Sequence, residues 1–242
     1  MQRFLQQRRF FDDDGHAVII ALRWQTSGAE LGYGMNPLPI THLLYLHGFR
    51  SSPQSTKAQQ MARLSSQVPG LTWWCPALPP SPKAAAALIL EGTRDWPNVS
   101  SAVMGSSLGG YYATWLATQR PWRAVVINPA THPARDLASY IGPHTCWHDP
   151  TQCFDFTQEH VLELSDLASP VLRFGAQVMP LIAKGDELLD WRDMAARYPD
   201  SPGVLCEGGD HAFSDFEKYM PEILKFLGLP IADCESYTVK SS

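Results

Sequence analysis

Long apolar runs and an excess of basic residues are both missing from this sequence of 242 residues. No apolar run approaches the roughly 20 residues that span a bilayer. The apolar stretch Ala17–Leu22 is too short for a signal-peptide core of about 7–15 residues. The formal net charge is −5, whereas a surface that binds nucleic acid needs a basic excess. We therefore expect no membrane segment, no export signal and no nucleic-acid partner.

Paired cysteines are also missing. The sequence has five cysteines, an odd number, and no CxxC spacing. They are Cys75, Cys146, Cys153, Cys206 and Cys234. A disulfide framework is not expected, and reduced thiols in a cytoplasmic protein are the better interpretation. With 45% hydrophobic and 18% charged residues, the composition is that of a globular protein, and the length suits one larger domain.

The composition divides the chain into an N-terminal extension, one domain and a tail. Residues 1–40 are rich in Gln and Arg, then acidic, then rich in Gly, and contain one weak strand at Ala17–Trp24. We expect this extension to be peripheral or disordered, with Met35 as a plausible alternative start. The domain occupies residues 41–229, and residues 230–242 form a C-terminal tail.

Within the domain, apolar runs alternate with helical patterns. The expected strands are His42–His47, Leu71–Cys75, Ser101–Met104, Ala124–Asn128, Val178–Ala183 and Val204–Glu207. The expected helices are Lys57–Gln67, Lys83–Glu91, Leu108–Thr118, Trp191–Tyr198 and Asp215–Leu227. This alternation predicts an α/β fold with a mostly parallel sheet and helices on both faces. Residues 131–170 break the rhythm, with short helices around Asp136–Ile141 and Gln158–Leu167, and are expected to form a small cap insertion.

A nucleophile motif lies between an expected strand and an expected helix. Residues 105–109 read Gly-Ser-Ser-Leu-Gly and match G-x-S-x-G, with Ser107 at the central position. A strand before the motif and a helix after it are the context in which the motif indicates a nucleophilic serine on a strained turn. The helix N-terminus then faces the developing oxyanion. Ser106 is the alternative nucleophile, but it stands one residue early.

A serine nucleophile needs a histidine base and an orienting carboxylate, in the chain order Ser, acid, His. Of the eight histidines, His211 alone follows a late strand, lies in a Gly-rich loop and precedes the last helix. Asp186 follows Gly185 at the carboxyl end of an expected strand, where catalytic groups gather in open α/β sheets. Glu187 and Asp190 are the alternative candidates for the acid, and each is also consistent with a loop carboxylate or a helix cap.

The oxyanion hole requires two backbone N–H donors. Leu108, after the nucleophile, is expected to supply one, and Phe49, after the strand that ends in His47-Gly48, the other. His47 and Tyr112 are expected at the substrate pocket, although a histidine in such a loop more often bonds the backbone. Trp73 and Trp74 are further candidates for lining an acyl pocket, whereas Trp115 is expected to pack in the core and Cys75 and Cys206 to be buried and inert.

Several of these motifs together resemble the YqiA/YcfP-type bacterial esterases. The matching stretches are residues 43–49, 105–114, 128–130, 185–190 and 207–213. The resemblance covers about residues 41–229 and implies a small α/β-hydrolase with esterase activity, extending to acyl-CoA thioesters. It assigns the triad roles to Ser107, Asp186 and His211. Family members tend to begin just before the His-Gly-Phe strand, so the first 40 residues depart from the pattern.

Other functions remain open on the sequence alone. His144, Cys146, His148 and Cys153 have the chemistry of zinc ligands, but their spacing fits no common template. We therefore expect no metal and no cofactor. A non-catalytic ligand-binding protein of the same fold, an acyltransferase and a perhydrolase are the alternatives to hydrolysis of a small acyl ester or thioester. The sequence does not indicate an oligomeric state.

Overall fold

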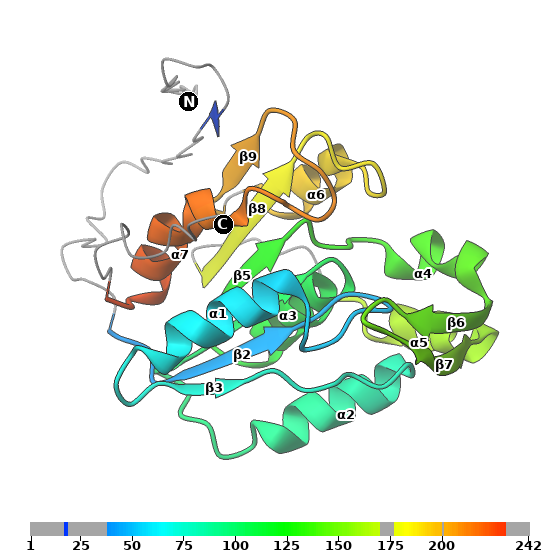
Figure 1. The fold of residues 1–242 in the computed structure, drawn as a ribbon, viewed down its shortest axis with the longest axis horizontal. Helices are drawn as coiled ribbons and strands as arrows, with labels where there is room; N and C mark the ends of the chain where they lie inside the picture. Colours follow the sequence, from blue (N-terminus) through cyan, green and yellow to red (C-terminus); the bar gives the residue numbers. More distant parts are fainter. Residues whose placement is uncertain (1–16, 19–37, 170–176, 200, 231–242) are drawn as a thin grey trace, which may run out of the picture.

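A seven-stranded sheet forms the centre of the computed structural model, which describes residues 17–18, 38–169, 177–199 and 201–230 (Figure 1). The strand order is β1-β9-β8-β5-β4-β2-β3. The strands are β1 (Ala17–Val18), β2 (His42–Leu46), β3 (Thr72–Trp74), β4 (Ser101–Ser106), β5 (Arg123–Ile127), β8 (Val178–Ala183) and β9 (Val204–Cys206). Neighbouring strands are parallel, except that β1 pairs antiparallel with β9.

Helices cover both faces of this sheet. They are α1 (Thr56–Ser66), α2 (Pro82–Gly92), α3 (Leu108–Gln119), α6 (Trp191–Arg197) and α7 (Met220–Leu227). One hydrophobic core joins α1 and α7 to one face, and the other joins α2 and α3 to the opposite face. Because both faces are covered, every residue of β4 and β8 is buried, which explains the nearly unbroken apolar runs. The expected α/β-hydrolase fold is confirmed.

The expected cap insertion contains a hairpin that the sequence did not predict. It comprises α4 (Pro133–Asp136), a 3-10 turn (Ala138–Tyr140), β6 (Gly142–Cys146), β7 (Asp149–Phe156) and α5 (Gln158–Asp166). In Figure 1 these elements lie beyond the strand ends to which the arrows point. The hairpin strands are mostly polar, with β7 mostly exposed and β6 mostly half-buried, so the apolar alternation that marks a strand is missing. The helix expected at Asp136–Ile141 is instead α4 followed by the 3-10 turn.

The remaining expected elements agree with the structure within two residues, with one correction. The last helix, expected over Asp215–Leu227, begins as a 3-10 turn at Phe216–Tyr219 and becomes α-helical only at Met220. Pro221 has no N–H to donate to the carbonyl of Glu217, so an α-helix does not run through this position unbroken. In the described ranges, no helix is long and apolar enough to cross a membrane.

The expected N-terminal strand is described only in part. Ala17 and Val18 pair with Cys206 and Leu205 at the edge of the sheet. The rest of residues 1–37, and the tail from residue 231, lie outside the described residues. The division into extension, domain and tail therefore stays a prediction.

Candidate active site

Ser107 occupies a sharp turn between β4 and α3. Its φ of 56° and ψ of −121° are a strained conformation for a residue with a side chain. The surrounding backbone holds it there, because Ser107 N–H donates to Ile127 O at 3.0 Å, and Ser107 O accepts from Gly110 N at 2.9 Å and Ala130 N at 3.0 Å. The strand–turn–helix context expected of a nucleophile elbow is therefore present.

The glycines of the motif permit this turn. A Cβ on Gly105 would collide with the backbone of Gly109, and a Cβ on Gly109 would collide with the carbonyl of Leu46. Gly48 has a related role, since its Cβ would lie 3.3 Å from Cβ and 3.7 Å from Oγ of Ser107. Glycine at position 48 therefore lets the loop after β2 approach the serine hydroxyl closely.

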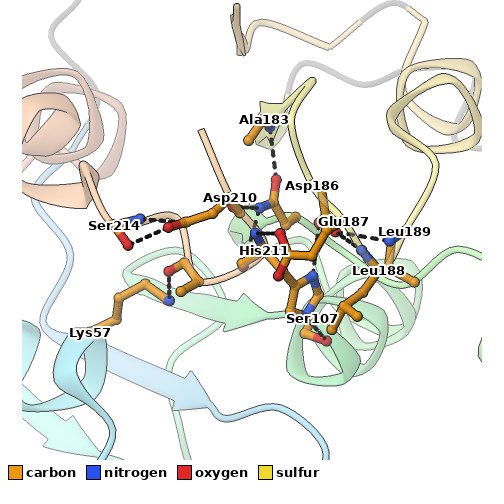
Figure 2. A network of polar contacts seen from close by, with 12 residues as sticks. Lys57, Ser107, Ala183, Asp186, Glu187, Leu188, Leu189, Asp210, His211 and Ser214 are labelled. Carbon is orange, nitrogen blue, oxygen red and sulfur yellow. Dashed lines mark hydrogen bonds and ion pairs between the residues drawn. The ribbon is translucent and has the colours of Figure 1, made fainter. Parts of the chain in front are cut away.

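Ser107, His211 and Asp186 form a continuous chain of hydrogen bonds (Figure 2). Ser107 Oγ lies 3.0 Å from His211 Nε2, and His211 Nδ1 lies 2.8 Å from Asp186 Oδ2. The Asp186 side chain is fully buried, and its Oδ1 accepts from the backbone N–H groups of Leu188 and Leu189, each at 2.8 Å. When Asp186 is ionised, its oxygen can only accept, so the His211 proton is on Nδ1. Nε2 of His211 is then unprotonated and can accept the Ser107 proton.

The rival residues have other partners. Ser106 ends β4 and makes no hydrogen bond with His211 among the described residues. Asp190 caps α6 by accepting from Arg192 N at 2.9 Å, which is the helix-cap role given above as its alternative. Glu187 Oε2 accepts the backbone N–H of His211 at 2.9 Å, so it holds the histidine loop rather than the imidazole.

Two further residues hold the histidine loop, and neither was predicted from the sequence to act at the site. Asn128, fully buried after β5, donates to Asp210 O at 2.9 Å and accepts from Ala183 N at 2.8 Å. Lys57 on α1 donates to the carbonyl of Ala212 (Figure 2). Burial lowers the pKa of Lys57, and the charge of Asp210 opposes that shift. Only Asn128 gave a signal in the sequence, as a polar residue at the carboxyl end of a parallel strand.

Both backbone donors expected in the oxyanion hole are unused. Neither Phe49 N–H nor Leu108 N–H donates a hydrogen bond to any described residue. Leu108 begins α3, and the first N–H groups of a helix have no partner within it. Phe49 follows Gly48, which lies against Ser107. Two N–H groups without a partner among the described residues thus lie on the two segments that meet at Ser107.

The cap insertion contacts this loop directly. The Phe49 ring makes edge-on contacts with four rings of the insertion, at centroid distances of 5.1–6.0 Å. They belong to Tyr140, His144, Phe154 and Phe156. The next residue, Arg50, donates through Nε to Thr145 O at 3.0 Å and accepts from Trp147 N at 2.8 Å. The cap insertion therefore fixes the loop that presents Phe49 N–H.

His47 has a structural role in the same loop. Its Nε2 accepts the backbone N–H of Leu78 at 3.0 Å, and its Nδ1 therefore carries the proton donated to Gly48 O at 3.0 Å. Burial lowers the pKa of His47, and the charge of His148 acts in the same direction. A neutral His47 thus ties the Pro-rich loop after β3 to the oxyanion loop.

A pocket of about 460 Å³ opens beside the two free donors. Both expected pocket residues, His47 and Tyr112, line it, whereas Trp73 and Trp74 do not. The other lining residues are Gly48, Phe49, Arg50, Ser51, Leu78, Pro79, Pro80, Leu108, Cys146, Thr151, Gln152, Cys153 and Phe154. A second hollow of about 420 Å³ follows residues 184–192. Neither Phe49 nor Leu108 lines it, so it is the poorer substrate site.

The remaining candidates have structural explanations. Trp115, on α3, packs in the core, as expected. Burial raises the pKa of the Cys75 thiol to about 12 and also raises the pKa of Cys206, which makes both thiols poor nucleophiles. In the described part of the chain, no group of three or more His, Cys, Asp or Glu side chains is arranged to hold a metal ion. His144 instead bonds Tyr140 O at 2.6 Å.

The sheet order and the elbow turn between β4 and α3 are those of an α/β-hydrolase fold. The chain belongs to the family described as Uncharacterised protein family (UPF0227), whose sequence profile matches residues 42–228, and the expected relationship to the YqiA/YcfP-type proteins is confirmed.

Solved structures show the same fold. One, described as LipS and LipT, two metagenome-derived lipolytic enzymes, has a TM-score of 0.59 and 19% identity over 77% of this chain and 92% of that one. Est1E from Butyrivibrio proteoclasticus with bound ferulic acid has a TM-score of 0.57 and 13% identity over 79% and 88%. Alpha/beta hydrolase domain-containing protein 10 from mouse has a TM-score of 0.56 and 16% identity over 77% and 90%.

Proposed function

We propose that the protein is a serine esterase that hydrolyses small acyl esters through an acyl-enzyme on Ser107. The observation that carries the proposal is the hydrogen-bonded chain from Ser107 through His211 to Asp186, with two unused N–H donors beside the serine. A binding protein has no need of this combination, because it neither removes a proton from a serine nor stabilises an oxyanion.

The geometry suits a two-step acyl transfer to water. His211 Nε2 takes the proton of Ser107 as Oγ attacks the ester carbonyl, and the buried Asp186 stabilises the resulting imidazolium. The N–H groups of Phe49 and Leu108 donate to the carbonyl oxygen as it becomes an oxyanion. His211 then protonates the leaving alcohol. In the second step His211 takes a proton from the water that attacks the acyl carbonyl. The bond from the acyl carbon to Oγ then breaks, His211 returns the proton to Ser107 Oγ, and the acid is released.

The pocket favours acyl groups of short to medium length. Its volume of about 460 Å³ is at the small end of the range for small-molecule sites. Among the described residues of the cap insertion, the helices α4 and α5 are short, and neither is the long apolar helix that would open on a lipid surface. Thioesters react by the same steps, and the family resemblance extends the proposal to acyl-CoA.

Labelling with a fluorophosphonate, which phosphonylates activated serines, tests the proposal. The wild-type protein should be labelled and should hydrolyse a soluble butyryl ester. Ser107→Ala should lose both properties, with turnover reduced by several orders of magnitude. Ser106→Ala is the matched control and should keep both. Labelling that persists in Ser107→Ala but disappears in Ser106→Ala would reassign the nucleophile, and an unlabelled wild-type protein would indicate a ligand-binding role. Product analysis with alcohol as a competing acceptor separates hydrolysis from acyl transfer.

A further inference from the structure

One cationic side chain borders the pocket next to the oxyanion loop. Arg50 directly follows Phe49 and lines the pocket. Among the described residues that line the pocket, Arg50 is the single arginine and there is no lysine, aspartate or glutamate. A negative group on a ligand in this pocket would therefore meet one positive partner and no acidic side chain of the lining.

Contacts with the cap insertion fix Arg50 in place. Its Nε donates to Thr145 O at 3.0 Å, its guanidinium carbon lies 3.9 Å from the centre of the Trp147 ring, and its carbonyl accepts from Trp147 N. These contacts use Nε and the face of the guanidinium. Because the side chain is already ordered, a ligand that binds it loses less conformational entropy than one that must order a free arginine.

The outer nitrogens of Arg50 remain unused. Nη1 and Nη2 form no hydrogen bond and no ion pair with any described residue. The carboxylate of Asp149, at the start of β7, accepts from Thr151 and Gln152 and does not pair with Arg50. The two outer nitrogens of a guanidinium match the paired oxygens of a carboxylate or a phosphate.

We propose that Arg50 determines specificity, so that the pocket favours acyl esters that carry a negatively charged group, either a carboxylate or a phosphate. This inference rests on the proposed hydrolase function. Arg50 and Phe49 line the same pocket, so an anion that binds Arg50 shares this pocket with the carbonyl that Phe49 N–H binds. The anion belongs either to the far end of a short acyl chain or to the leaving group, according to which part of the ester occupies the pocket.

Two matched pairs of esters distinguish these positions. For the acyl side, 4-nitrophenyl hemiglutarate carries a terminal carboxylate, and 4-nitrophenyl valerate is its uncharged partner of equal chain length. For the leaving group, 4-carboxyphenyl butyrate is compared with 4-carbamoylphenyl butyrate. In one pair, the wild-type protein should have a kcat/KM about tenfold or more higher for the charged ester, the size expected of hydrogen bonds to a charged group. Salt should lower this ratio.

Three variants test the role of Arg50. Arg50→Gln should lose the charged-to-neutral ratio, and Arg50→Lys should keep part of it. Arg63→Gln removes the same charge from an exposed position on α1, outside the pocket, and should leave the ratio unchanged. A ratio near one in the wild type, or a ratio that Arg50→Gln leaves intact while both rates fall together, would overturn the proposal and assign Arg50 to holding the cap insertion alone. If Arg50→Gln does not fold, the wild-type protein alone tests the proposal. A charged-to-neutral ratio that falls with added salt supports it, and a ratio that salt leaves unchanged contradicts it. Absence of any Ser107-dependent hydrolysis of the four esters contradicts the proposed function instead.

Discussion

The side-chain amide of Asn128 donates to the carbonyl oxygen of His211 at 3.3 Å, although 83 residues separate them in the chain. The same nitrogen donates to Asp210 O at 2.9 Å, and the amide oxygen accepts from Ala183 N at 2.8 Å. Asn128 thereby joins the loop that carries the proposed base to the end of the strand that leads to the proposed acid. It does so from a buried position with a φ of 39°, which asparagine tolerates better than most residues.

Asn128→Asp should weaken both stability and activity. The substitution keeps the shape but replaces the N–H donors with an oxygen that faces two carbonyl oxygens. An unsatisfied buried polar group costs about 1–3 kcal/mol, so we expect a loss of that size in the free energy of unfolding, together with a fall in kcat. Urea unfolding and ester turnover measure the two effects. Asn98→Asp, at an exposed position, is the control; equal losses in both variants would contradict the assigned role.

Asp186→Asn should abolish most activity while the fold persists. An asparagine at this position can donate to Nδ1 of His211, which places the imidazole proton on Nε2. A protonated Nε2 cannot accept the proton of Ser107. We expect kcat to fall on the order of 10³- to 10⁴-fold, as for other triads. Asp190→Asn removes a carboxylate four residues away that caps α6 and pairs with the exposed Arg192 side chain. Because asparagine caps a helix about as well as aspartate, this control should change stability and kcat little. Comparable loss of kcat in the two variants would favour Asp190 as the acid.

The sheet and the candidate triad were predictable because each depends on local signals. β8 was expected over the six residues it occupies, Val178–Ala183, since an unbroken apolar run predicts a strand buried on both faces. Ser107 stands in a five-residue motif that requires a strand before it and a helix after it. Asp186 and His211 followed from the chain order of an α/β-hydrolase.

What the sequence did not reveal depends on contacts between distant segments. The β6–β7 hairpin has few apolar residues, because β7 is largely exposed, β6 is only half-buried, and the two strands pair with each other. Lys57 contacts the carbonyl of Ala212 across 155 residues, and no local pattern encodes that pairing. Arg50 follows a recognisable motif, but its contacts with the cap insertion required a hairpin that was not expected.

Protonation of His47 should destabilise the fold in mildly acidic solution. Burial lowers the pKa of His47 from its usual 6.5, so the unfolded chain takes up a proton at a pH where the folded chain does not. The contribution is complete above pH 6.5 and is lost as the pH falls below it. Urea unfolding of wild type and His47→Gln between pH 8 and pH 5 should show a shallower decline for the variant. Exposed His132→Gln is the control; an equally shallow decline there would contradict the role of His47.

Soluble short-chain esters should be the best simple substrates. Each buried methylene contributes about 0.8 kcal/mol, but only while apolar surface remains to cover it. A pocket of about 460 Å³ should therefore give a kcat/KM that rises over the first few carbons and then levels off. The measurement is a series of 4-nitrophenyl esters from acetate to palmitate, below and above the micellar limit. A sharp rise in rate on emulsified long-chain triglyceride, with little turnover of butyrate, would contradict this expectation.

Phe49→Ala should lower kcat more than it raises KM. The backbone N–H of Phe49 remains in the variant, but the ring that packs against Tyr140, His144, Phe154 and Phe156 is lost, so the loop is less firmly held against the cap insertion. Loss of a whole oxyanion donor costs about 10²- to 10³-fold in kcat, and a displaced donor should cost a substantial part of that. Phe49→Tyr, which keeps the ring, is the matched control and should retain most of the activity. Steady-state kinetics on a butyryl ester separate the two parameters. A rise in KM at constant kcat would show that the ring serves only as a wall of the pocket, whereas a selective fall in kcat would identify Phe49 as the residue through which the cap insertion positions the oxyanion hole.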